Sequence, residues 1–194
     1  LDFETINYGV PRYKNSKTYE QVVFQASLHI ESKKGALEHK EILITDKKDP
    51  RERVADFLIN EVTEKGSIVV YHASFEKSRI KELAILFPEK SEKLLSLIDR
   101  VVDLEEVFTK LGYYNTNFEG KTSIKYVLPV LVKELGYDRL AIQNGSQAQV
   151  EFLAVRDGIH KGKMKDKVRK DLLEYCKLDT LAMYEIKEAV RKMV

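Results

Sequence analysis

Cysteine and long apolar runs are both scarce in this chain of 194 residues. The single cysteine, Cys176, excludes an internal disulfide and any zinc site built from cysteines, which fits a reducing compartment. The longest apolar runs, 68–71 and 127–132, are far shorter than a membrane span. We therefore expect a soluble, cytoplasmic protein with no membrane partner.

Net charge is also small, because 33 basic residues stand against 31 acidic ones and leave +2. No overall field indicates a polyanionic partner, so any nucleic-acid surface must be local. The densest basic run is 161–170, and its pattern fits either a solvated loop and helix start or a contact with nucleic acid.

Linkers and repeats are absent from the sequence as well. No tract rich in Pro, Gly or Ser divides it, and its length suits one sizeable core, so residues 1–194 are predicted to form a single domain. The strand-like segment 1–6 opens the chain directly. Since a central strand normally has more apolar residues ahead of it, we expect that upstream residues are missing.

Apolar periodicity predicts an α/β fold. Alternation indicates strands, and apolar residues at steps of three and four indicate helices. The predicted order is strands at 1–6, 22–30 and 37–44, a helix beginning at Pro50 behind Asp49, a strand at 67–71, a helix capped by Ser74, a strand at 100–103, and helices to the end. This order is expected of a mixed five-stranded sheet flanked by helices.

Two carboxylates lie on the first predicted strand. Asp2 and Glu4 are two residues apart, so both side chains emerge from one face and can converge on one cation. The alternative is that the pair forms the polar face of an edge strand.

A third carboxylate lies within the apolar stripe of the C-terminal helix. Val168, Leu172, Tyr175, Asp179 and Met183 recur at helical spacing on the face predicted to be buried. A buried carboxylate costs several kcal/mol unless it is paired, hydrogen-bonded or metal-bound. Asp179 is therefore expected to bind a cation. The alternative is that Tyr175 is a core tyrosine and that Asp179 beside it is bonded to an arginine or a helix end.

A fourth carboxylate, Glu76, follows the strand at 67–71 and falls in the first turn of the next helix. Ligands of open α/β sheets gather at such strand ends. Acidic residues are also favoured in a first helical turn by the helix dipole, which is the alternative reading of this position.

These segments together resemble the three motifs of the DEDD exonuclease superfamily, whose fold is ribonuclease H-like. Residues 1–5, with DFET, are similar to the first motif, 72–76 to the second and 175–179 to the third. Segments 101–104 and 122–128 are similar to further superfamily segments. The Tyr-x-x-x-Asp of the third motif indicates the tyrosine subclass. The whole sequence most resembles an uncharacterised bacterial branch of DnaQ-like domains, often the C-terminal part of a longer protein.

Two positions depart from the superfamily pattern. Glu76 stands where aspartate is usual, and its longer side chain would bind a metal through water or change the metal preference. His72 stands where asparagine is usual.

The resemblance implies a 3′-5′ exonuclease that uses two Mg²⁺ or Mn²⁺ ions. By that resemblance, Asp2 bridges both ions, Glu4 and Asp179 hold the ion nearer the nucleophile, and Glu76 reaches the other mainly through water. Tyr175 would hydrogen-bond the attacking water as an orienting group rather than a base.

The expected substrate is the 3′ end of single-stranded DNA or RNA. Phe3 and Phe75 are candidates for stacking on the terminal base, with the hydrophobic core as their alternative place. Thr5 and Lys125 are candidates for contacts with the last phosphates, and His72 for a further substrate contact.

Several alternatives remain open at this point. Asp103 is either an outer-shell residue of the metal site or a helix cap at a strand end. The domain itself is either an exonuclease, a short-oligonucleotide hydrolase, or a weakly active or inactive nucleic-acid-binding or docking domain of a larger nuclease. Other domains of a longer chain are expected partners.

Overall fold

Three long strands form an antiparallel sheet in the computed structural model, which describes residues 1–110 and 112–193. They are β1 (Asp2–Asn7), β2 (Gln21–Glu31) and β3 (Leu37–Leu43), in the order β1-β2-β3. A tight turn at 32–36 joins β2 to β3, and Gly35 occupies its left-handed position with φ +80°. The predicted hairpin is confirmed.

Two short strands, β4 (Ile68–Val70) and β5 (Val101–Asp103), pair in parallel as a separate sheet. The mixed α/β class is therefore confirmed, whereas the strands form two sheets rather than the single five-stranded sheet expected. Each strand of this pair has only three residues. A hydrogen bond of 2.9 Å from the amino nitrogen of Leu1 to the carbonyl oxygen of Val69 connects the residue before β1 to β4.

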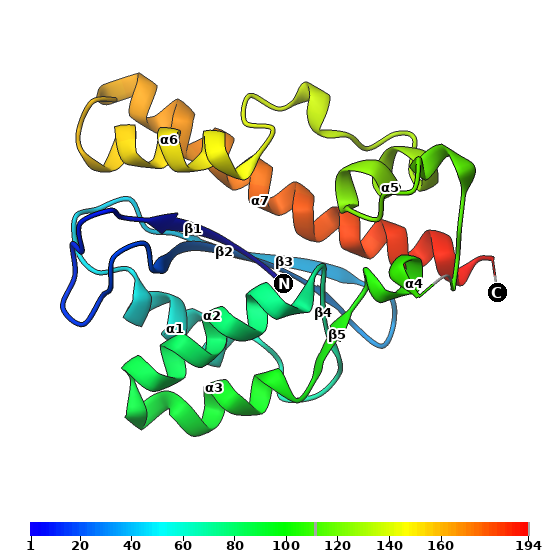
Figure 1. Cartoon of the computed structure of the whole chain (residues 1–194), viewed down its shortest axis with the longest axis horizontal. Helices are drawn as coiled ribbons and strands as arrows, with labels where there is room; N and C mark the ends of the chain where they lie inside the picture. Colours follow the sequence, from blue (N-terminus) through cyan, green and yellow to red (C-terminus); the bar gives the residue numbers. More distant parts are fainter. Residues whose placement is uncertain (111, 194) are drawn as a thin grey trace.

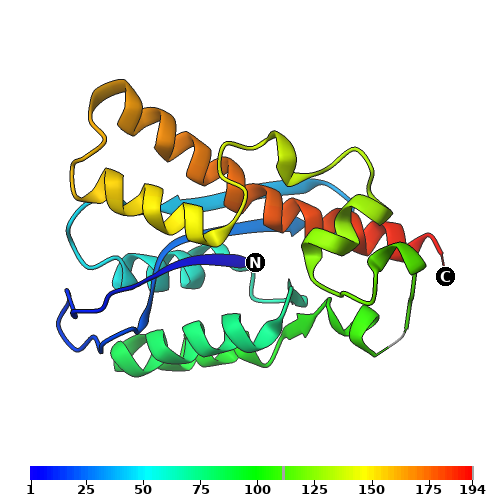
Figure 2. The same ribbon diagram turned by 45° about the horizontal axis from the view of Figure 1, so that its top comes forward.

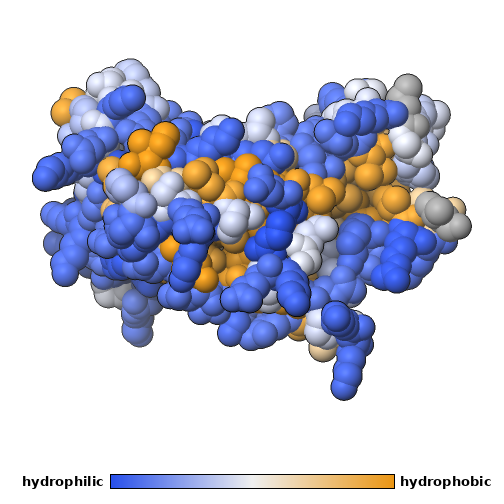
Figure 3. Space-filling view, turned by 90° about the horizontal axis from the view of Figure 1, so that it is seen from below, coloured by the Kyte–Doolittle hydropathy of each residue, from blue (hydrophilic) through white to orange (hydrophobic). Residues whose placement is uncertain are grey.

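Helices cover both faces of the larger sheet (Figure 1). One face carries α1 (Arg51–Glu61), α2 (Ala73–Leu86) and α3 (Ser91–Ile98), which bury apolar side chains against β1 and β2. Seen from below, hydrophilic side chains cover most of the surface, with a band of hydrophobic atoms between them (Figure 3).

The opposite face carries α6 (Gly145–Arg156) and the long α7 (Gly162–Arg191) (Figure 2). The rings of Phe24 on β2 and Phe152 on α6 stack with centroids 3.8 Å apart. The second half of α7 extends past the sheet and packs with α4 (Glu106–Thr109) and α5 (Ile124–Leu131). Short 3₁₀ turns complete the chain: η1 (Pro88–Lys90), η2 (Thr116–Phe118) and η3 (Tyr137–Arg139).

Helix starts differ from the predicted ones in their caps. The side chain of Asp49 accepts from the backbone nitrogen of Arg51 at 3.1 Å, so the predicted start of α1 is correct within one residue. The prediction that Ser74 caps α2 is wrong, because Ser74 lies inside the helix. The residue before the helix is His72, which has a left-handed conformation. Asp103 at the end of β5 supplies the capping carboxylate instead.

Within the residues described, none of the helices is both long enough and apolar enough to cross a membrane.

Candidate metal centre

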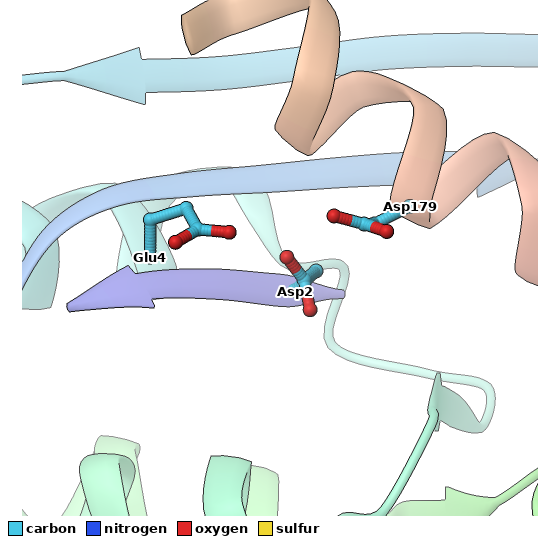
Figure 4. Close-up of side chains that lie close together, drawn as sticks. All are labelled: Asp2, Glu4 and Asp179. Carbon is cyan, nitrogen blue, oxygen red and sulfur yellow. The ribbon is translucent and has the colours of Figure 1, made fainter. Parts of the chain in front are cut away.

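Three carboxylates from opposite ends of the chain converge between β1 and α7. Asp2, Glu4 and Asp179 each present an oxygen, and these oxygens lie within 4.8 Å of one another. Figure 4 shows all three side chains pointing toward a common centre. Strand alternation places Asp2 and Glu4 on the face covered by α7, as the spacing predicted.

Buried hydrogen bonds hold α7 in position over the sheet. The Gln25 side chain donates to the Leu172 carbonyl at 2.8 Å. One turn past Tyr175, the hydroxyl of Thr180 lies 2.9 Å from that of Ser27 and 2.8 Å from Nδ1 of His29. These bonds on both sides of Asp179 set its place beside β1.

The fourth carboxylate, Glu76, lies in the first turn of α2 and is almost fully enclosed at 2% exposure. It does not belong to the group of three, yet its charge raises the pKa of Asp2, so the two side chains are neighbours. Its Oε2 has no hydrogen-bond partner among the residues that the structure describes. A buried carboxylate oxygen without a partner is rare in folded proteins, and a cation is one kind of group that could satisfy it.

Burial is the first cause that raises the pKa of each of these four carboxyls, and the charge of a neighbouring carboxylate adds to it. Burial raises the pKa of Asp2 to about 7, with the charge of Glu76 as the next cause. Burial likewise raises the pKa of Glu76 to about 7. The pKa values of Glu4 and Asp179 rise for the same first reason, followed in each by the charge of Asp2. The protein therefore supplies less positive charge than four ionised carboxylates require.

Lys125 on α5 is a cation that approaches the cluster. Its charge lowers the pKa of both Glu4 and Asp179, although burial outweighs that effect. The ammonium group donates to the Gln143 carbonyl at 2.7 Å and lies 5.9 Å from the ring centroid of Tyr175. Lys125 therefore lies near Glu4 and Asp179, and its contact with substrate phosphates stays a prediction.

Tyr175 and Cys176 lie beside the carboxylates on α7, and both are buried. Burial raises the pKa of the Tyr175 hydroxyl, and the charges of Asp179 and Glu4 raise it further. The phenol therefore stays protonated at neutral pH. The Cys176 thiol lies 3.4 Å from Oδ2 of Asp2 and donates to it, a contact that sequence reasoning missed.

Asp103 is the cap of α2, which was one of its two predicted roles. Its oxygens accept from the backbone nitrogens of His72, Ala73 and Glu105 at 2.8 to 3.0 Å. This cap fixes the start of the helix that carries Glu76. His72 itself is exposed, and its Nδ1 lies 3.0 Å from a Glu105 oxygen.

Other predicted substrate contacts are placed differently. Phe3 is 4% exposed within the core between the sheet and α1–α3, because alternation turns it away from Asp2 and Glu4. Of the two places expected for Phe3, the structure confirms the hydrophobic core and not the stacking position. Thr5 is also buried, and its hydroxyl donates to Gln21 at 2.6 Å, so it is not free for a phosphate. Phe75 packs partly against the same core, with the Arg79 guanidinium 5.1 Å from its ring centroid.

A cleft of about 220 Å³ opens next to the cluster. Its lining comes from β1, the link between β4 and α2, the residues before α4, the start of α5, and α7: Asp2, Tyr71, His72, Glu105, Ser123, Ile124, Asp179 and Met183. The basic run 161–170 belongs instead to the start of α7, where Lys167 and Lys170 pair with acidic residues one turn onward. That pairing fits the solvated alternative for the run.

Tyr137 was not predicted and contacts the cluster directly. Its hydroxyl donates to Oδ1 of Asp179 at 2.6 Å. Tyr137 lies in η3, within a loop that has no apolar periodicity, so no sequence signal pointed to it.

Fold and cluster together define an α/β domain with an acidic centre suited to a hard divalent cation. The chain belongs to the family described as "Domain of unknown function (DUF2779)", whose model matches residues 1–123. That match includes Asp2, Glu4 and Glu76, while Tyr175 and Asp179 lie beyond it.

Similarity to three other proteins extends over nearly the whole chain. "Uncharacterized protein MG366" of Mycoplasma genitalium is 32% identical over an alignment 209 positions long. The alignment covers 96% of this chain and 31% of that protein. The "Uncharacterized protein MG366 homolog" of Mycoplasma pneumoniae and "Uncharacterized protein UU173" of Ureaplasma parvum are each 28% identical and cover 100% of this chain, and 32% and 31% of their own lengths. The chain therefore spans about a third of the length of these relatives. No solved structure matches it.

Proposed function

We propose that this domain is a metal-dependent nuclease that hydrolyses phosphodiester bonds at the 3′ end of single-stranded nucleic acid. One observation carries the proposal. Carboxylate oxygens of Asp2, Glu4 and Asp179 meet within 4.8 Å, beside a buried Glu76 whose Oε2 lacks a partner among the residues described. Gathering three carboxylates, with a fourth buried nearby, is costly unless a cation compensates their charge.

The donor set fits two Mg²⁺ or Mn²⁺ ions. All the donors are carboxylate oxygens, which hard cations prefer, and the described residues form no comparable histidine or cysteine group. By the DEDD resemblance, Asp2, Glu4 and Asp179 would hold one ion, and Asp2 with Glu76 would hold the other.

Bound cations of this kind supply an activated water and neutralise the charge on the leaving 3′ oxygen. The chain's own residues do the positioning. Tyr175 hydrogen-bonds and orients the attacking water, since a phenol with a raised pKa is not a base at neutral pH. Lys125 contacts a phosphate beside the cluster, since its charge already acts on Glu4 and Asp179.

The terminal nucleoside occupies the cleft next to Asp2 and Asp179. His72, which is exposed at its rim, and Ser123 at the start of α5 provide polar contacts there. Phe75 remains a stacking candidate at its uncovered edge, whereas Phe3 and Thr5 have no part in substrate binding.

A ribonuclease H-like arrangement is part of the same proposal. The hydrogen bond from Leu1 to Val69 supports it, because β1 then lies between β2 and β4. The two sheets would then follow one another in the order β3-β2-β1 and β4-β5. The DEDD resemblance and the motif order favour this reading, with the tyrosine subclass indicated by Tyr175.

The test is a 5′-labelled ladder assay on matched DNA and RNA strands with Mn²⁺. The wild type is expected to shorten the strand from its 3′ end, and Asp179→Asn to abolish shortening because it removes a charged ligand. Asp166→Asn, an exposed change on the same helix, is the matched control and should cleave like the wild type. If the strand is bound but never shortened, a nucleic-acid-binding or docking role within a longer protein replaces the proposal.

A further inference from the structure

Tyr137 reaches the acidic cluster from a segment that carries no recognised motif. The segment between α5 and α6 runs along the outer side of α7 in both ribbon views (Figures 1 and 2). From its 3₁₀ turn, the Tyr137 hydroxyl donates to Oδ1 of Asp179 at 2.6 Å. At 2.6 Å this is at the short end of the range for hydrogen bonds between two oxygens.

The surrounding loop is built to keep that phenol in place. The ring of Tyr137 packs at 60° to that of Tyr175, with centroids 6.1 Å apart. The ammonium group of Lys125 lies 5.4 Å from the Tyr137 ring centroid and donates to the Gln143 carbonyl. The Gln143 amide in turn donates to the carbonyls of Asp138, within the turn, and Leu140, directly after it. The chain that follows Tyr137 is therefore tied to Gln143, and through Lys125 to α5.

A single hydrogen bond to a carboxylate oxygen leaves the other lone pairs available for a cation. It also fixes the plane of the carboxylate, which removes an entropic cost when a metal binds. Residues that hold metal ligands in this way typically change metal affinity about 10- to 100-fold when they are replaced.

We propose that Tyr137 is a positioning residue that holds the Asp179 carboxylate in its metal-binding orientation and so sets the affinity of the site for divalent cations. This inference rests on the proposed function. It assigns a role in the site to the segment between α5 and α6, which neither the motifs nor the family match include. The competing explanation is that Tyr137 only anchors the loop.

The test compares Mn²⁺ binding by calorimetry in the wild type, Tyr137→Phe and Tyr13→Phe. The phenylalanine variant keeps the ring and removes only the hydroxyl that Asp179 accepts from. It should bind Mn²⁺ about 10-fold more weakly while its thermal midpoint without metal stays close to wild type. Tyr13→Phe removes a hydroxyl that accepts from Arg156 and should leave the Mn²⁺ affinity unchanged.

Activity supplies a second readout. The Mn²⁺ concentration for half-maximal hydrolysis should rise about 10-fold in Tyr137→Phe, with the rate at saturating Mn²⁺ largely restored. Wild-type affinity in Tyr137→Phe overturns the positioning role and leaves the nuclease proposal standing. A lower thermal midpoint with unchanged Mn²⁺ affinity also overturns the positioning role, and it supports the explanation that Tyr137 only anchors the loop. No heat from the wild-type protein overturns the metal site itself, and this inference with it.

Discussion

Replacing Glu76 with glutamine removes a negative charge from the interior while nearly preserving the shape of the side chain. Glu76 is 2% exposed, and its Oε2 lacks a partner within residues 1–110 and 112–193. Burial raises its pKa from 4.5 to about 7. Ionising this group in the folded protein therefore costs on the order of 3 kcal/mol relative to the unfolded chain.

The sign of the pH dependence follows from that raised pKa. Between pH 4.5 and about 7 the folded state binds more protons at Glu76 than the unfolded state. The stability that this group contributes is therefore complete below pH 4.5 and is lost as pH rises to 7. Glutamine does not titrate, so Glu76→Gln should match the wild type near pH 4.5 and exceed it by roughly 3 kcal/mol at pH 8.

Urea unfolding followed by circular dichroism, with a chelator present, measures this difference across the pH range. The expected gain at pH 8 corresponds to a rise of roughly 6 to 12 °C in thermal midpoint for a domain of this size. Glu64→Gln, in an exposed loop, is the control and should show no such pH-dependent gain. A Glu76→Gln protein that is less stable than wild type at pH 8 would show that this carboxylate is already satisfied, and would refute the reasoning.

Further outcomes are expected at the other positions. Mn²⁺ at about 100 times its dissociation constant should stabilise the wild type by roughly 2.7 kcal/mol, measured as a higher thermal midpoint, and this gain should vanish in Asp179→Asn. Asp103→Ala should lower the free energy of unfolding in urea by about 1 to 3 kcal/mol, because three backbone nitrogens lose their acceptor. Lys125→Ala should weaken strand binding and reduce its salt dependence by about one phosphate contact, measured by fluorescence anisotropy, whereas the exposed Lys133→Ala should not.

Local periodicity was sufficient to predict the carboxylates that meet. The period of two on β1 put Asp2 and Glu4 on one face, and the period of the long helix put Tyr175 and Asp179 on its buried face. The same alternation already implied that Phe3 points the other way. Its proposed stacking role came from its residue type alone, and the burial of its ring contradicts that role.

Features made by tertiary contacts escaped prediction. The cap of α2 comes from Asp103, about 30 residues away in sequence, and an adjacent Ser74 gave a misleading local signal. Tyr137 reaches Asp179 only because its loop is folded back by Gln143 and Lys125. The sequence predicted the short strands β4 and β5. It did not predict that they form a separate sheet, nor the hydrogen bond from Leu1 to Val69 that connects them to the start of β1.

Anomalous diffraction from crystals soaked in Mn²⁺ would locate the ions themselves. We expect two peaks roughly 3.5 to 4 Å apart, with carboxylate oxygens of Asp2, Glu4 and Asp179 around one and Glu76 near the other. A map with no peak between β1 and α7 at saturating Mn²⁺, or with peaks only at surface carboxylates, would contradict this expectation.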